Sequence, residues 1–75
     1  MDDKFLQGLA EALQRDAAAI HPEDAFRDYD EWDSLAVLSV MAMIEEQYGV
    51  LFSRKDLDAC VTVADLYAHA VGGKK

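Results

Sequence analysis

Apolar residues recur at helical spacing in two long stretches of the chain. Residues 3–18 place apolar side chains on one face of a helix, and Asp2 or Asp3 can cap its start. Residues 34–48 carry a stronger apolar stripe and predict a second helix. This helix should end at Gly49, because glycine is the residue type most common just beyond helix C-termini.

Two further segments show shorter helical patterns. Ser53 can cap a short helix at about residues 55–59, and Thr62 can cap a last helix over residues 63–71. The C-terminal residues 71–75 are expected to form a frayed tail. No segment shows the alternation that is typical of strands.

The segment 20–33 is predicted to be a long loop, because Pro22 disfavours helical geometry in the residue before it. Residues 23–33 hold six acidic residues against one base, Arg27, a local charge of 1 − 6 = −5. Large aromatic side chains recur here at every third position: Phe26, Tyr29 and Trp32. We expect Phe26 and Trp32 to pack against the helices and so pin the loop, whereas the sequence does not decide whether Tyr29 does the same. The pattern predicts an all-α fold, a small four-helix bundle of one domain (residues 1–75) with a long loop between helices 1 and 2 and a short third helix.

The charge balance narrows the classes of partner. The chain of 75 residues has 15 acidic and 7 basic residues, a net charge of −8. Such a protein is repelled by nucleic acids and anionic membranes and suits partners with basic surfaces. The start of the chain lacks the pattern of a signal peptide, and no apolar run is long enough to span a membrane. We therefore expect a cytoplasmic monomer, and its small size leaves little room for a catalytic cleft.

No metal site is expected. Cys60 is the only cysteine, so an internal disulfide is impossible and a small core residue is the expected role. Cys60, His21 and His69 lack the spacing of a metal site. Residues 28–33 superficially resemble a calcium loop, but they lack its invariant glycine and its bidentate glutamate.

Ser34 is the candidate for chemistry. If Asp33 is the N-cap of the second helix, Ser34 occupies the first helical position. Unpaired N–H groups and the helix dipole at that point suit a covalently attached phosphate. A hydrolase role is disfavoured, because no Gly-x-Ser-x-Gly elbow surrounds Ser34 and the chain offers only two histidines as bases. We interpret Ser34 as a residue modified by a partner enzyme.

Three segments resemble the acyl carrier protein family in order and spacing: Asp33-Ser34-Leu35, Ile44-Glu45-Glu46-Gln47-Tyr48-Gly49-Val50 and Thr62-Val63-Ala64-Asp65-Leu66. The resemblance covers nearly the whole chain. It implies a non-catalytic carrier whose Ser34 receives 4′-phosphopantetheine from coenzyme A through a phosphopantetheinyl transferase. An acyl group held as a thioester on this arm would then pass between acyl-loading and acyl-processing enzymes with basic surfaces.

The resemblance also implies partner-binding residues. Asp33 should cap the helix and contact the transferase, and Leu35 should enter partner pockets. Glu45 and Glu46 should pair with basic groups of partners, although a solvated face explains them equally well.

The second helix departs from typical fatty-acid carriers. Ala36 and Ser39 stand where those carriers have acidic residues. Ala36 and Leu38 would then extend an apolar patch from Leu35, unless Leu38 packs inward. The departure leaves fatty-acid, lipid and specialised polyketide-like pathways open.

Several alternatives remain open at this level. Four residues of the second helix could line an acyl tunnel or simply fill the core: Val40, Met41, Met43 and Ile44. Asp56 and Asp58 of the short third helix could meet partners or serve capping and solubility. An aminoacyl or peptidyl carrier, or an unmodified acidic helical adaptor, are the competing functions.

Overall fold

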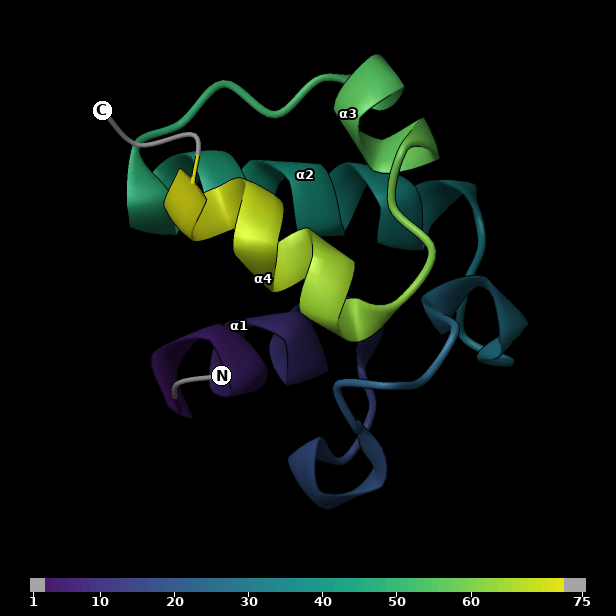
Figure 1. The fold of residues 1–75 in the computed structure, drawn as a ribbon. Coiled ribbons are helices and arrows are strands. Elements are labelled where there is room, and N and C mark those ends of the chain that lie inside the picture. The colour runs from purple at the N-terminus through teal and green to yellow at the C-terminus, as the bar shows by residue number, and fades with distance from the viewer. Residues whose placement is uncertain (1–2, 73–75) are drawn as a thin grey trace.

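The computed structural model describes residues 3–72, and within them it shows four α-helices and no strand (Figure 1). The helices are α1 (Asp3–Leu13), α2 (Ser34–Tyr48), α3 (Arg54–Asp58) and α4 (Val63–Gly72). Two 3₁₀ helices, η1 (Ala17–Ala19) and η2 (Phe26–Asp28), lie between α1 and α2. The predicted all-α arrangement with a short third helix is confirmed.

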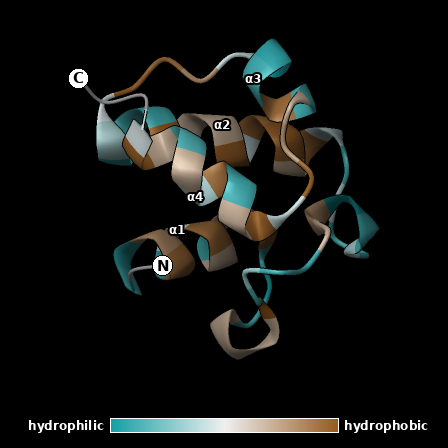
Figure 2. Cartoon of the chain, viewed as in Figure 1, coloured by the Kyte–Doolittle hydropathy of each residue, from teal (hydrophilic) through white to brown (hydrophobic). Residues whose placement is uncertain are grey.

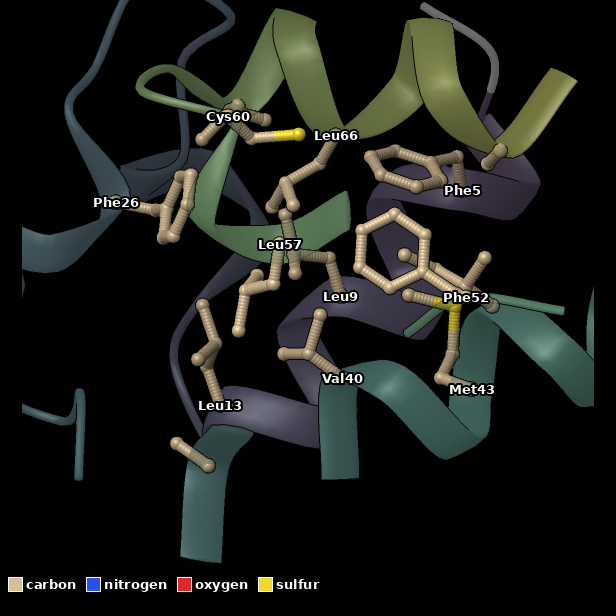
Figure 3. Close-up of a cluster of buried hydrophobic side chains, with 14 of the residues drawn as sticks. Phe5, Leu9, Leu13, Phe26, Val40, Met43, Phe52, Leu57, Cys60 and Leu66 are labelled. Carbon is tan, nitrogen blue, oxygen red and sulfur yellow. The ribbon is translucent and has the colours of Figure 1, made fainter. Parts of the chain in front are cut away.

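Aromatic rings join three of the helices. The ring centroid of Phe5 in α1 lies 6.0 Å from that of Tyr48 in α2 and 5.1 Å from that of Tyr67 in α4. Figure 2 shows hydrophobic residues distributed along α1, α2 and α4, whereas α3 is mostly hydrophilic. Figure 3 shows buried side chains from all four helices converging on one core, in which Leu9, Val40 and Leu66 have no exposed surface.

The first helix is shorter than predicted. It ends at Leu13 instead of residue 18, because Gln14 adopts a left-handed backbone with φ of 57°. The N–H of Arg15 then donates to the carbonyl of Ala10 at 2.9 Å, which closes the helix end. Asp16 accepts a hydrogen bond from the N–H of Ala18 at 3.1 Å and caps η1. These local hydrogen bonds outweigh the high helix propensity of the three alanines that follow.

The predicted loop is ordered by its aromatic residues. Phe26 is fully buried, and its ring lies 4.8 Å from that of the partly buried Trp32. Tyr29, whose position the sequence left open, is 9% exposed and also belongs to the core. The loop further contains η2, and one antiparallel bridge joins Ala25 of the loop to Thr62, the residue before α4. The expected pinning of the loop is confirmed.

The second helix has the predicted bounds. Oδ1 of Asp33 accepts a hydrogen bond from the N–H of Ala36 at 2.8 Å, so Asp33 is the N-cap. Gly49 takes the left-handed conformation with φ of 65° at the C-terminal end.

The last two helices begin with reciprocal caps. Ser53 and Asp56 form a capping box at α3, which lies one residue earlier at each end than predicted. At α4 the N–H of Asp65 donates to Oγ1 of Thr62 at 3.2 Å, and the N–H of Thr62 donates to the Asp65 carboxylate at 3.1 Å.

The prediction of a frayed tail from residue 71 is wrong in part. Val71 and Gly72 belong to α4, because the helical ladder extends through them. Residues 73–75 of the predicted tail and the alternative cap Asp2 lie outside the described residues.

Candidate functional site

Ser34 is presented to solvent at the first position of α2. Asp33 supplies the cap, so the Ser34 side chain is not needed to satisfy the helix end. Within the described part of the chain, the Ser34 hydroxyl makes no hydrogen bond. The Ser34 side chain is therefore exposed to solvent and not engaged in the fold.

The backbone around Ser34 favours an anionic group. Among residues 3–72, the N–H groups of Ser34 and Leu35 have no hydrogen-bond acceptor, whereas those of Ala36 and Val37 bond to Asp33. Free N–H groups at the start of a 15-residue helix carry the positive end of its dipole. A phosphodiester on Ser34 would lie within this favourable field, so the site fits such a group.

Neither histidine is bonded to Ser34. Nδ1 of His69 lies 3.5 Å from Sγ of Cys60 and 3.3 Å from the carbonyl oxygen of Asp65, in α4 and the turn before it. No side-chain hydrogen bond from His21 reaches Ser34 within the described residues. Among residues 3–72, Ser34 therefore shows no Ser–His hydrogen bond of the kind that activates a nucleophilic serine.

Two leucines project beside Ser34. Leu35 is 70% exposed and Leu38 is 65% exposed, so Leu38 does not pack inward. Their i, i+3 spacing places them on the same face of α2. Ala36 is only 5% exposed, so its side chain lies in the core and adds nothing to this surface. The predicted apolar patch therefore consists of Leu35 and Leu38 alone.

The two predicted glutamates lie at the far end of α2. Both are exposed, and along the helix they are about 17 Å from Ser34, given a rise of about 1.5 Å per residue. An Oε2 atom of Glu45 accepts a hydrogen bond from the N–H of Phe52 at 3.3 Å. Glu46 lines a cavity between α1 and α2. A partner that contacts Ser34 and both glutamates must therefore cover most of the length of α2.

Arg15 holds the loop that leads to Ser34. Its guanidinium lies over the Tyr29 ring, 4.0 Å from the ring centroid, and forms a 2.8 Å ion pair with Glu31. The Tyr29 hydroxyl donates to the Asp24 carboxylate at 2.6 Å. Burial raises the pKa of Tyr29 to about 12, and the hydrogen bond from Tyr29 lowers the pKa of Asp24. Hydrogen bonds from its own backbone and from Arg15 lower the pKa of Glu31.

Arg27 joins the same loop to α3. It donates hydrogen bonds to the carbonyl oxygens of Leu57, at 2.8 Å, and of Cys60. Its guanidinium also lies 3.9 Å from the carboxylate of Asp58. Sequence reasoning noted Arg27 only as a charge, although a lone base among six acids was a usable signal. Arg15 was missed because the predicted first helix ran past it.

The remaining candidates lie in the core or in caps. Cys60 is fully buried, and burial raises the pKa of its thiol to about 11, which confirms a core role. Val40 and Ile44 have no exposed surface and Met43 is 9% exposed. Asp56 belongs to the capping box of α3. Within residues 3–72, no three His, Cys, Asp or Glu side chains gather closely enough to hold a metal ion.

Two cavities lie along α1 and α2. The first, of about 260 Å³, is lined by Asp33 and Leu35 on either side of Ser34 and by Ala12 and Gln14. The second, of about 300 Å³, lies further along the two helices and is also lined by Ala12. None of the helices in the described part of the chain has the length and apolarity needed to cross a membrane.

Comparison with known proteins gives a consistent result. Residues 3–70 match the model of the phosphopantetheine attachment site family. The chain is 30% identical over 71 residues to the meromycolate extension acyl carrier protein of Mycolicibacterium smegmatis, covering 89% of this chain and 72% of that protein. It is 33% identical over 67 residues to acyl carrier protein 3 of Ralstonia nicotianae, covering 89% of this chain and 77% of that protein.

Some relatives are considerably longer. The chain is 30% identical to the meromycolate extension acyl carrier protein of Mycobacterium tuberculosis but spans only 62% of its length. No solved structure gave a significant match.

Proposed function

This chain belongs to the phosphopantetheine attachment site family, and from that premise we propose that it is an acyl carrier protein with 4′-phosphopantetheine on Ser34. The observation that carries the proposal is the exposed Ser34 hydroxyl at the N-terminus of α2, beside two N–H groups without an acceptor in the described structure. The attached arm would supply a terminal thiol that holds the cargo as a thioester.

The loading step requires a separate transferase. The Ser34 oxygen would attack the phosphorus of coenzyme A next to the pantetheine, forming a new O–P bond. The bond between the two phosphates would break, adenosine 3′,5′-bisphosphate would leave, and a base of the transferase would take the hydroxyl proton. The absence of a base bonded to Ser34 in the described structure supports a role as substrate of this enzyme instead of catalyst.

Surface features support partners that combine an apolar pocket with basic groups. Leu35 and Leu38 offer an apolar contact next to Ser34, and Asp33 adds a carboxylate at the same end of α2. Glu45 and Glu46 would meet basic groups at the other end. A net charge of −8 would steer such partners toward the carrier at rates that fall with salt.

We propose an acyl cargo in a fatty-acid, lipid or polyketide-like pathway. Acyl carrier proteins among the relatives support this class of cargo. Meromycolate extension is the role that their names give to the mycobacterial relatives, some of which exceed this chain considerably in length.

The packed core also supports a second candidate, an aminoacyl or peptidyl carrier. Val40 and Ile44, which could have lined an acyl tunnel, are fully buried among other core residues. A carrier of a small polar cargo needs no internal shelter, so a filled core suits it equally well. Loading assays with acyl and aminoacyl donors would separate the two carriers.

The decisive experiment is intact mass after incubation with coenzyme A and a broad-specificity phosphopantetheinyl transferase. We expect a gain of one phosphopantetheine group, lost in Ser34→Ala and retained in Ser39→Ala, a matched change on the same helix. If Ser34→Ala still gained this mass, the group would be attached to a residue other than Ser34. No gain in the folded wild type, with a working control carrier, would favour the unmodified acidic adaptor.

A further inference from the structure

The loop that leads into α2 carries carboxylates that the fold does not use. Asp28 and Asp30 are both exposed, and their side chains form no hydrogen bond or ion pair with any residue that the structure describes. Glu31, in contrast, is paired with Arg15 at 2.8 Å. The carboxylates of Asp28 and Asp30 are therefore free to meet groups of another molecule.

A turn places Asp30 at the surface, close to Ser34 along the chain. The N–H of Trp32 donates to the carbonyl of Tyr29 at 3.0 Å, so Asp30 occupies a central position of this turn. Tyr29 is buried and Trp32 is partly buried, so both ends of the turn are held against the core. Asp30 lies four residues before Ser34, which limits their separation to about 14 Å even for an extended chain.

The segments that follow Ser34 contribute no net negative charge. Residues 34–44, the first eleven of α2, contain no charged side chain. Helix α3 contains two basic and two acidic residues, and one of the acids, Asp58, already lies 3.9 Å from Arg27 and 3.8 Å from Arg54. Residues 28–33 hold four acidic residues and no base, so the negative charge next to Ser34 in the chain is concentrated in the loop before it.

Exposed leucines continue this surface beyond Ser34. Leu35 and Leu38 lie on one face of α2, and both are largely exposed. Among the described residues, only Oδ1 of Asp33 accepts a hydrogen bond, so its second carboxylate oxygen stays free. Ser34 thus stands between an acidic and an apolar group of side chains. We call these five side chains the loading face: Asp28, Asp30, Asp33, Leu35 and Leu38.

We propose that the phosphopantetheinyl transferase docks on the loading face, an inference that rests on the proposed function. The enzyme receives Leu35 and Leu38 in an apolar pocket and places Lys or Arg side chains against Asp28 and Asp30. The loop before α2, and not α2 itself or α3, then supplies the charged half of the contact.

The chemistry of the donor requires these basic groups. Coenzyme A carries a diphosphate and a 3′-phosphate, and the attack of the Ser34 oxygen on phosphorus brings the acidic loop close to them. Negative charges at such short range repel one another unless cations lie between them. A transferase that loads this chain must therefore present Lys or Arg side chains to the loop, in addition to those that bind coenzyme A.

The loop is held in place before the enzyme arrives. Arg27 donates hydrogen bonds to the carbonyl oxygens of Leu57, at 2.8 Å, and of Cys60, while Arg15 pairs with Glu31. A segment that is already ordered loses less conformational entropy on docking. The two arginines therefore position the loop, while the free carboxylates of the loading face remain available to the enzyme.

The test measures how the full chain is loaded by a broad-specificity phosphopantetheinyl transferase. Intact mass gives initial rates at several carrier concentrations, and from them the KM for the carrier. We expect Asp30→Asn to raise this KM about threefold, and Asp28→Asn with Asp30→Asn about tenfold, the effects expected of one and two charge contacts at a hydrated interface. The kcat should change little.

Glu23→Gln is the matched control for charge. It removes one negative charge from the same loop, so long-range attraction to the enzyme falls by the same amount as in Asp30→Asn. Glu23 lies beside the start of α4, because the carbonyl oxygens of its neighbours Pro22 and Asp24 accept hydrogen bonds from the N–H groups of Ala64 and Val63. Its replacement should leave the KM unchanged.

The apolar half of the loading face has its own variant and control. Leu38→Ala should raise the KM about tenfold, as expected when a side chain that fills a partner's pocket is truncated. Leu51→Ala makes the same change at a position that is 88% exposed in the loop after α2, and it should leave the KM unchanged. About 0.5 M NaCl should diminish the effect of Asp30→Asn, because salt screens charge contacts, but not that of Leu38→Ala.

Two results would overturn the inference while leaving the proposed function intact, provided that prolonged incubation still gives the full mass gain. An equal rise of the KM in Asp30→Asn and Glu23→Gln would show that only net charge matters. An unchanged KM in both Asp30→Asn and Leu38→Ala would place the contact elsewhere. Melting curves verify that each variant is folded. A wild type that gains no mass would instead overturn the proposed function, and this inference with it.

Discussion

The guanidinium of Arg15 lies 4.0 Å from the centre of the Tyr29 ring. Arg15 follows the end of α1, and Tyr29 lies in the loop that leads to Ser34. The contact, together with the 2.8 Å ion pair between Arg15 and Glu31, ties this loop to the helix before it. The position of the candidate site thus depends on a cation–π contact and an ion pair between residues that lie far apart in the sequence.

Replacement of Arg15 should therefore loosen the loop. We expect Arg15→Ala to lower the free energy of unfolding by about 1–2 kcal/mol, the combined size of one cation–π contact and one partly buried ion pair. Urea unfolding measures the loss, and hydrogen exchange should show faster exchange at Tyr29 and Trp32. Arg54→Ala removes only an exposed i, i+4 pair with Asp58 and should cost much less. Equal losses in the two variants would contradict the prediction.

Two positions with a left-handed backbone should respond to glycine in opposite directions. Gly49→Ala should destabilise the protein by about 1 kcal/mol, because φ of 65° strains any residue with a Cβ atom although no atom lies within 4 Å of the added carbon. Gln14→Gly should stabilise it by up to about 1 kcal/mol, since φ of 57° is then unstrained. Urea unfolding measures both.

Gly72→Ala is the matched control for this pair. Gly72 lies in α4 without a left-handed backbone and with open space around its α-carbon, so alanine there should not destabilise the protein. A loss in Gly72→Ala as large as that in Gly49→Ala would show that the backbone conformation is not the cause.

Acid should remove the stabilising contribution of the α4 cap. The N–H groups of Val61 and Thr62 donate to the Asp65 carboxylate at 2.9 and 3.1 Å and lower its pKa from 3.8. Because the folded pKa lies below the unfolded one, the contribution is present above the unfolded value and is lost as the pH falls through the folded value. Asp65→Asn should lower the melting temperature at neutral pH.

The difference in melting temperature between Asp65→Asn and the wild type should then become smaller in acid. Melting curves recorded from neutral pH to below the pKa of Asp65 in the unfolded chain would measure this difference. Asp30→Asn controls for the loss of one negative charge, since Asp30 is exposed and forms no hydrogen bond or ion pair among the described residues. A gap of constant size across this pH range would contradict a role for the ionised cap.

Added salt should stabilise the protein. The net charge of −8 makes like-charge repulsion the dominant long-range interaction, and the ion pairs of the described residues are partly or largely exposed. We expect the melting temperature to rise from low salt to physiological ionic strength, and Mg²⁺ to act at lower concentration than Na⁺. A melting temperature that does not change with salt would count against a dominant role of like-charge repulsion.

The local chemistry of the helix ends could be read from the sequence. Asp33, Gly49, Ser53 and Thr62 occupy the expected capping positions, because a cap involves hydrogen bonds between residues only three or four positions apart. The exposure of Ser34 followed from the same reasoning, since a residue at the first helical position next to a separate cap has its side chain free.

The faces of α2 could not be read in this way. Apolar residues occur on all sides of this helix, so periodicity alone did not decide whether Ala36 or Leu38 faces the core. The packing of α1 and α4 against α2 decided it, burying Ala36 to 5% exposure and leaving Leu38 at 65%. The end of α1 at Leu13 likewise depended on hydrogen bonds that compete with the helix propensity of residues 17–19.

The sequence by itself determined the four helices, their caps and the serine at the start of the second one, because each depends on side-chain chemistry within one or two helical turns. The tertiary structure alone decided which leucines face solvent, how Arg15 and Arg27 hold the loop before Ser34, and where cavities open between α1 and α2. These features join residues that are far apart along the chain, and only the packing of one helix against another brings such residues into contact.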